Sequence, residues 1–168
     1  MSISPDQTYL GRTFEDSRWA WARTVRVRRR AVIAQATLLS ALVAATVTAA
    51  ATDAGWNTPF FIVWTVGMLA FIPLHSTLNA GIRGVFDRSV RSLDEHQQRL
   101  RDRSFTAMAW PATALHLAAW SGAVAVVGLT GHVVLGLCLG FLLWFTAGLL
   151  AYWHLAWTAP EEPADADL

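Results

Sequence analysis

Three histidines lie in apolar parts of the sequence, and their side chains are the ones best suited to carry chemistry. His75, His116 and His154 all fall in stretches without Asp, Glu, Lys or Arg. Neutral imidazole is the commonest metal ligand, and helical bundles hold metals or haem between facing side chains. Counted along helices that enter from the same side, His75 and His154 lie at similar depth. They are therefore the candidate cofactor-binding residues.

The alternative for these histidines is a structural one. Gln35 and Asn79 lie near the same predicted level, and polar groups buried among apolar ones need hydrogen-bond partners. Such interhelical bonds contribute about 0.6 to 2 kcal/mol each in membranes. No carboxylate lies in these stretches to orient a ligating imidazole. We therefore expect His75, Asn79 and His154 to bond with one another, with no metal and no cofactor.

Motifs of the common enzyme classes are missing from the sequence. It contains no Gly-rich phosphate loop, no H-E-x-x-H and no G-x-S-x-G. A single cysteine, Cys138, excludes an internal disulfide framework and a multi-cysteine metal site. We expect a protein that is not an enzyme and has no catalytic residues.

The elements that position these residues are predicted by hydropathy. The chain has 168 residues, of which 54% are hydrophobic and 15% charged, against roughly 25% charged in soluble domains. Uncharged apolar runs of about 20 residues are typical of membrane-spanning helices. We predict an all-α integral membrane protein, a four-helix bundle of two hairpins, with spans at about 31–51, 58–80, 111–129 and 133–157.

The orientation follows from the arginines. All thirteen basic residues are Arg, and they are confined to residues 12–30 and 83–103. Arg and Lys near span ends stay on the cytoplasmic side. We expect a multi-pass protein with both termini in the cytoplasm, an Arg-rich tail over residues 1–30 and an acidic, disordered tail over residues 158–168.

The Arg-rich tail allows two kinds of partner. Basic segments bind nucleic acid, but Arg residues beside a first span also attract anionic headgroups, at about 1 kcal/mol each. We favour the lipid bilayer as the partner and expect no nucleic acid.

The sequence pattern in the loop between the second and third spans predicts a separate helix over residues 93–109. Ser92 and Glu95 have the spacing of a capping box, and Pro111 is expected to end or kink this helix before the third span. Glu95 with Arg99, and Asp87 with Arg91, are acid-before-base pairs at the i,i+4 spacing that stabilises helices.

Apolar positions in this loop recur at alternating spacings of four and three, which places them on one helical face. That face can lie against lipid headgroups. Alternatively it contacts a second copy or a cytoplasmic protein, with Gln97 as the polar position that sets the register. The candidate interaction residues on it are Leu93, Gln97 and Leu100.

A further contact is predicted in the fourth span. Gly136 and Gly140 have the four-residue spacing that lets helix backbones approach closely, either inside one chain or between two copies.

The loop also carries a resemblance. The run Leu93-Asp94-Glu95-His96-Gln97, followed by Arg101-Asp102-Arg103-Ser104, resembles the L-D-E-R-Q and R-D-R-A element of small, uncharacterised multi-span membrane proteins of actinobacteria, with His96 where those have Arg. The resemblance implies a bacterial inner-membrane protein and brings no known activity. We therefore expect a non-enzymatic interaction or regulatory membrane protein. The alternative is a small cofactor-binding or transport subunit that uses the histidine layer.

Overall fold

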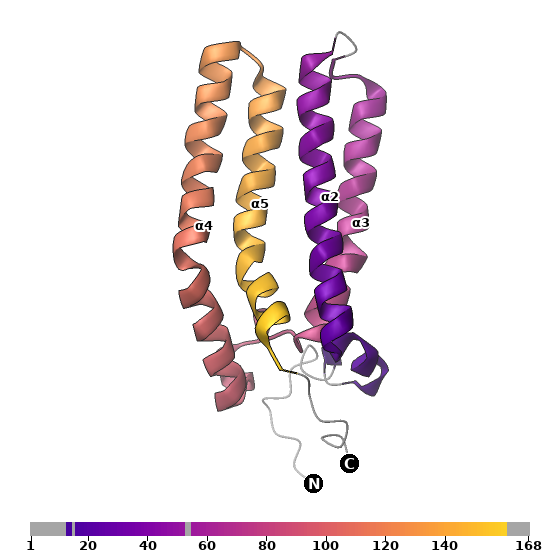
Figure 1. Ribbon diagram of the computed structural model, residues 1–168, viewed down its shortest axis with the longest axis vertical. Helices are drawn as coiled ribbons and strands as arrows, with labels where there is room; N and C mark the ends of the chain where they lie inside the picture. The colour runs from indigo at the N-terminus through magenta and orange to yellow at the C-terminus, as the bar shows by residue number, and fades with distance from the viewer. Residues whose placement is uncertain (1–12, 15, 53–54, 161–168) are drawn as a thin grey trace. The chain divides into compact units, whose positions relative to one another are not determined.

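A computed structural model describes residues 13–14, 16–52 and 55–160 of the chain. These residues form helices and turns and contain no strand. Four long helices, each long and apolar enough to cross a membrane, account for most of them (Figure 1), which confirms the all-α class with four candidate spans. In chain order the elements are η1 (Ser17–Arg23), α2 (Val25–Ala51), α3 (Thr58–Gly81), η2 (Val90–Ser92), α4 (Glu95–Thr130) and α5 (Val133–Thr158).

The chain divides into two compact units, and every long helix contributes one segment to each. Unit 1 consists of the described residues within 1–33, 74–107 and 151–168. Unit 2 consists of residues 34–73 and 108–150.

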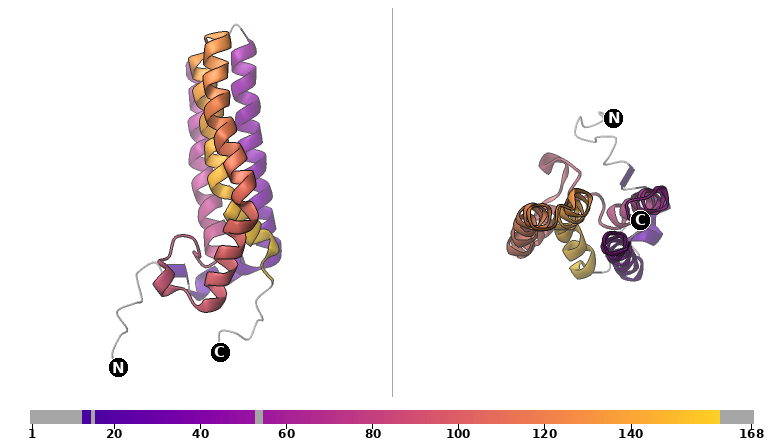
Figure 2. Two further views of the ribbon diagram at one scale, coloured as in Figure 1. Left: turned by 90° about the vertical axis from the view of Figure 1, so that its left-hand side faces the viewer. Right: turned by 90° about the horizontal axis from the view of Figure 1, so that it is seen from above.

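Unit 2 is a bundle of four helix segments joined by aromatic and small side chains. The rings of Phe71 on α3 and Phe145 on α5 meet edge to face, with centroids 4.8 Å apart. A side chain built at Gly67 of α3 would lie 2.8 Å from Leu42 of α2, so these two helices approach closely. Within unit 2, the α4–α5 turn lies at the same end as the α2–α3 connection (Figures 1 and 2). The two hairpins therefore run in the same sense.

The outer surface of unit 2 is apolar. Trp120 and Val124 are each 71% exposed, and Leu129 is 86% exposed. Apolar patches of this kind are rare on soluble monomers. They match the surface that the hydrocarbon of a bilayer would cover.

Unit 1 has a hydrophobic core of its own, built from the ends of three helices and the segment that follows α3. Leu78 of α3, Ile82, Leu93 and Leu155 of α5 are buried together, and Leu100 of α4 packs against them. This core orders the connection between α3 and α4.

The first long helix begins at Val25, six residues before the predicted start of the first span. Residues 17–23 and 25–30, predicted as part of a tail, are helical. The Thr24 hydroxyl accepts a hydrogen bond from the Val27 N–H at 3.4 Å, which caps the new start. At the other end of the chain, α5 ends at Thr158, and the predicted disorder of the acidic tail beyond residue 160 lies outside the described residues.

The connector helix and the third span form one continuous helix, α4, so the connector helix does not end at Pro111. Proline removes one backbone hydrogen bond, and membrane helices tolerate it because other bonds compensate. The expected cap was wrong. The Asp94 carboxylate accepts the Gln97 N–H at 2.7 Å, whereas the Ser92 hydroxyl donates to the Ser89 carbonyl at 2.8 Å.

Candidate functional site

A pocket of about 390 Å³ lies in unit 1, and basic side chains line one part of it. We call it the basic pocket. Its polar lining consists of Arg23, Arg28, Arg83, Asp94, His96 and Gln97, and its other lining residues are Gly81, Ile82, Val85, Leu100, Leu155, Ala159 and Pro160.

Arg28 is held at the pocket by the end of the last helix. Its side chain is only 3% exposed, and Nη2 donates to the carbonyl oxygens of Ala159 at 2.7 Å and Pro160 at 2.9 Å. The last carbonyls of a helix lack partners within the helix and carry partial negative charge. Ala159 and Pro160 directly follow α5, so a cation bound to their carbonyls lies near this negative end and ties the start of α2 to the end of α5.

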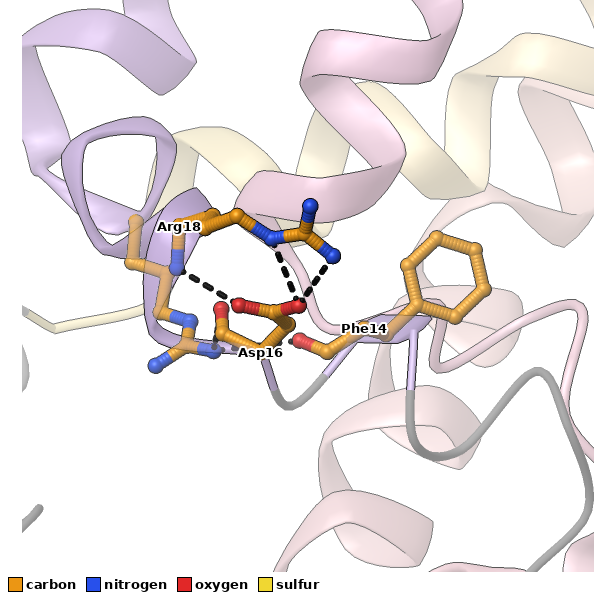
Figure 3. Close-up of polar contacts among 4 residues, drawn as sticks. Phe14, Asp16 and Arg18 are labelled. Atoms are coloured by element: carbon orange, nitrogen blue, oxygen red, sulfur yellow. Dashed lines mark hydrogen bonds and ion pairs between the residues drawn. The ribbon is translucent and has the colours of Figure 1, made fainter.

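Arg23 is held in a similar way by the segment before η1. Its Nη2 donates to the carbonyl oxygens of Phe14 at 3.1 Å and Asp16 at 3.2 Å. Asp16 itself begins η1: its carboxylate accepts the Arg18 N–H at 2.9 Å and forms an ion pair with the Arg18 side chain at 2.7 Å (Figure 3). The hydrogen bond from the Arg18 side chain lowers the pKa of Asp16 below its usual value of 3.8.

Arg83 has an unusual backbone conformation. It follows the end of α3 with a φ of 54°, in the left-handed region that favours glycine. The N–H of Gly84 donates to the carbonyl of Asn79 at 2.9 Å, and the N–H of Arg83 donates to that of Ala80 at 3.2 Å. These two bonds are those of a Schellman motif, in which glycine is the usual residue at the position of Arg83.

The predicted interaction residues Leu93, Gln97 and Leu100 have different surroundings in the structure. Leu93 is 6% exposed in the core of unit 1, so the prediction that it belongs to an open contact face does not fit its position. The face was derived from a continuous helix, but residues before Glu95 form turns and η2, which breaks the periodicity. Gln97 and Leu100 line the basic pocket.

Asp87 joins two helix ends through hydrogen bonds that the sequence did not reveal. Asn79 of α3 donates from Nδ2 to one carboxylate oxygen, and the Tyr152 hydroxyl of α5 donates to the other at 2.8 Å. The ring of His75 lies 5.1 Å from that of Tyr152, centroid to centroid. The expected i,i+4 pair of Glu95 with Arg99 is confirmed at 2.9 Å. Asp87, expected to pair with Arg91, instead bonds across the fold, and only tertiary contacts reveal that.

The described contacts of His75 and His154 are with different residues. The Nδ1 of His154 lies 3.1 Å from the hydroxyl of Ser104, which is 1% exposed. His75 packs on Tyr152, two residues from His154, and two helical residues point about 200° apart. In the part of the chain that the structure describes, no three His, Cys, Asp or Glu residues gather as a metal site.

The predicted small-residue contact lies between α5 and α4 in unit 2. A side chain at Gly136 would lie 3.0 Å from the Ala123 carbonyl, and one at Gly140 would lie 3.1 Å from the Ala119 carbonyl. The glycines therefore serve packing within the chain. They also line an apolar pocket of about 320 Å³ beside Trp120.

Comparison with known proteins gives no guide to the activity. No protein-family model, no curated protein and no solved structure matches the chain. The resemblance of the loop to actinobacterial membrane proteins therefore stays a prediction.

The chemistry of the basic pocket is that of binding. A guanidinium stays protonated at all physiological pH values, so it does not act as an acid or a base but donates up to five hydrogen bonds. Three guanidinium groups and one carboxylate line the pocket.

Proposed function

We propose that this chain is a non-enzymatic, multi-pass protein of the bacterial inner membrane, and that unit 1 is its folded interaction module on the cytoplasmic side. The observation that carries the proposal is the gathering of basic side chains in unit 1. Every Arg among the described residues belongs to unit 1, whereas unit 2 presents apolar side chains. Arg near the ends of membrane spans is retained in the cytoplasm.

The connectivity supports the same orientation for both ends of the chain. Unit 1 contains the start of α2, the end of α3, the start of α4 and the end of α5. An even number of crossings brings the first and last segments to one side of the membrane. Both termini would then be cytoplasmic.

The segment between α3 and α4 in unit 1 is held by hydrogen bonds, which supports a role in recognition. Arg88 donates from Nη2 to the Ser92 carbonyl at 2.6 Å, and Arg101 of α4 donates from Nη1 to the Arg88 carbonyl at 3.2 Å. These bonds, with the buried Leu93, hold the segment between α3 and α4 in one conformation. A preformed surface binds with a smaller loss of conformational entropy than a loose loop.

Site-directed labelling tests this proposal. With Cys138 replaced by serine, single cysteines would be placed at His96, in unit 1, and at His132, in the α4–α5 turn of unit 2; both positions are exposed. A maleimide that does not cross membranes should label His132→Cys in cells whose inner membrane is intact, and His96→Cys only after the membrane is opened. The opposite pattern would refute the orientation, and labelling of both before opening would refute the four crossings.

A further inference from the structure

Three exposed arginines at the start of α2 line an open groove in unit 1. The groove has a volume of about 640 Å³, and its lining consists of Thr24, Val25, Arg26, Arg29, Arg30 and Ile33. We call it the arginine groove. We propose that it binds the headgroup of an anionic phospholipid, whose acyl chains lie along Ile33. The inference rests on the proposed function, because it names a partner of the same unit 1.

The spacing of the arginines places their charges on one side of the helix. The three arginines and Ile33 stand at positions i, i+3, i+4 and i+7 of α2, which share one helical face. All four side chains are exposed, whereas Ala31 between them is buried in the core of unit 1. The guanidinium groups therefore face outward as one stripe.

The three charges are available to an anion. In the described part of the chain, no carboxylate lies within ion-pair distance of Arg26, Arg29 or Arg30. The guanidinium groups of Arg26 and Arg30 make no hydrogen bond there, and Nη2 of Arg29 donates to the neutral carbonyl of Trp157 at 3.5 Å. Like charges three and four positions apart on a helix repel one another. A bound anion would relieve this repulsion.

Two exposed tryptophans lie beside the groove. The guanidinium of Arg29 is 5.1 Å from the centroid of the Trp157 ring, near the end of α5. The hydroxyl of Thr24 donates to the carbonyl of Trp21, in η1, at 3.1 Å. Both tryptophan side chains are exposed. Because tryptophan gathers at the level of the lipid headgroups, these contacts favour the same level for the arginine groove.

The exposed Ile33 favours a phospholipid over a soluble anion. This side chain is 55% exposed and follows Arg30 by three residues in a helix long and apolar enough to cross a membrane. At 1.5 Å per residue, it lies about 4.5 Å further along the helix than Arg30. Arginine forms charge-assisted hydrogen bonds with phosphate oxygens, and basic residues next to a membrane helix attract anionic lipids. A phospholipid satisfies both parts of the groove, whereas a soluble phosphate leaves Ile33 uncovered.

The experiment uses the full chain purified in a neutral detergent, with bound lipid counted by native mass spectrometry. Phosphatidylglycerol is titrated into the protein, and phosphatidylcholine with the same acyl chains serves as the probe without net charge. We expect the wild type to bind phosphatidylglycerol more tightly than phosphatidylcholine. A wild type without this preference would overturn the proposal.

A double variant, Arg26→Gln with Arg30→Gln, removes two charges from the groove. It removes no hydrogen bond or ion pair within the described part of the chain. Its affinity for phosphatidylglycerol should fall about 25-fold, since each arginine near an anionic surface contributes a factor of about five. An unchanged affinity would contradict the assignment of the lipid to this groove.

The matched control is Arg91→Gln with Arg103→Gln, which removes the same charge from exposed positions of unit 1 outside the groove. It should leave the affinity almost unchanged. Equal losses in the two double variants would reduce the effect to general surface charge and overturn the proposal. If the groove variant melts at a lower temperature than the wild type without lipid, Arg30→Gln alone must show a selective loss of about fivefold.

Other occupants of the groove would be recognised by competition. Inorganic phosphate that displaces phosphatidylglycerol would assign the groove to a soluble anion, and a short DNA duplex that displaces it would assign the groove to nucleic acid. Either result would overturn the proposal. Failure of the proposed function is read separately, from the labelling of His96→Cys in cells. A groove that selects phosphatidylglycerol in a chain whose unit 1 is labelled from outside would refute the orientation alone.

Discussion

Arg28 and Ala159 lie 131 positions apart in the sequence, and a hydrogen bond of 2.7 Å joins the guanidinium Nη2 of the first to the carbonyl oxygen of the second. This contact ties the start of the first long helix to the end of the last. It satisfies a helix-terminal carbonyl and places a positive charge in the basic pocket. One residue therefore both joins two distant segments of unit 1 and lines its pocket.

Arg28→Lys tests this closure, since it keeps the charge but loses the planar fork. We expect it to lower the free energy of unfolding by about 1 to 3 kcal/mol, the scale of hydrogen bonds from a charged donor. Arg29→Lys is the control, because Arg29 is exposed, its guanidinium lies 5.1 Å from the centroid of the Trp157 ring, and its hydrogen bond to the Trp157 carbonyl is long, at 3.5 Å. Its effect should stay below about 1 kcal/mol. Denaturant titration of the purified chain measures both, and equal effects would contradict the special role of Arg28.

The polar contacts of His75 and His154 predict which pairs of residues have a coupling energy in a double-mutant cycle. A double-mutant cycle of His154→Ala with Ser104→Ala should give a coupling energy of about 0.6 kcal/mol, a typical value for membrane proteins. The same cycle between His154 and His75 should give none, because their neighbours differ. Coupling between the two histidines, or a Soret band lost in both alanine variants, would favour the cofactor hypothesis instead.

Gly140 and Gly148 of α5 should respond differently to replacement by a larger side chain. Gly140→Val should destabilise unit 2 by about 1 to 3 kcal/mol, as overpacking does, since the Ala119 carbonyl lies 3.1 Å from the new Cβ. Gly148→Val is the control, because a Cβ there meets nothing within 4 Å. Thermal unfolding should separate the two variants. A mild Gly140→Val together with a severe Gly148→Val would contradict the α4–α5 contact.

The start of α4 gives a prediction about capping. Asp94→Ala should cost about 0.5 to 2 kcal/mol, because it removes the acceptor of the Gln97 N–H. Asp94→Asn should retain most of the stability, since asparagine caps helices equally well. Denaturant titration of the two variants tests this, and a loss in Asp94→Asn equal to that in Asp94→Ala would show that the carboxylate charge matters instead.

The lowered pKa of Asp16 gives a pH dependence with a defined sign. The folded-state pKa lies below the usual 3.8, so the contribution of this carboxylate is complete at neutral pH and is lost as the pH falls through the folded value. The carboxyl carbon resonance of Asp16 should titrate below pH 3.8 in the wild type. In Arg18→Ala, which lacks the hydrogen bond that lowers this pKa, it should titrate nearer the usual value. An unchanged titration would rule out the ion pair as the cause.

The positions of the long helices are predictable from local features of the sequence. The uncharged stretches over residues 31–51, 54–82 and 104–160 predicted four apolar helices, and the confinement of Arg to two segments predicted which helix ends belong together. Both features are local, because hydropathy and charge act on each segment wherever the others lie. The predicted second and fourth spans, 58–80 and 133–157, differ from α3 and α5 by one residue at one end each.

The candidate site is formed by contacts that the sequence did not predict. The bonds of Arg28 to Ala159 and of Tyr152 to Asp87, and the burial of Leu93, depend on segments far apart in the chain. No spacing along one segment encodes them. The cap at Asp94 and the left-handed Arg83 depend on where neighbouring segments begin and end. Contacts between distant segments form only when the whole chain buries its apolar surface, which is why the basic pocket appears in the fold and not in the sequence.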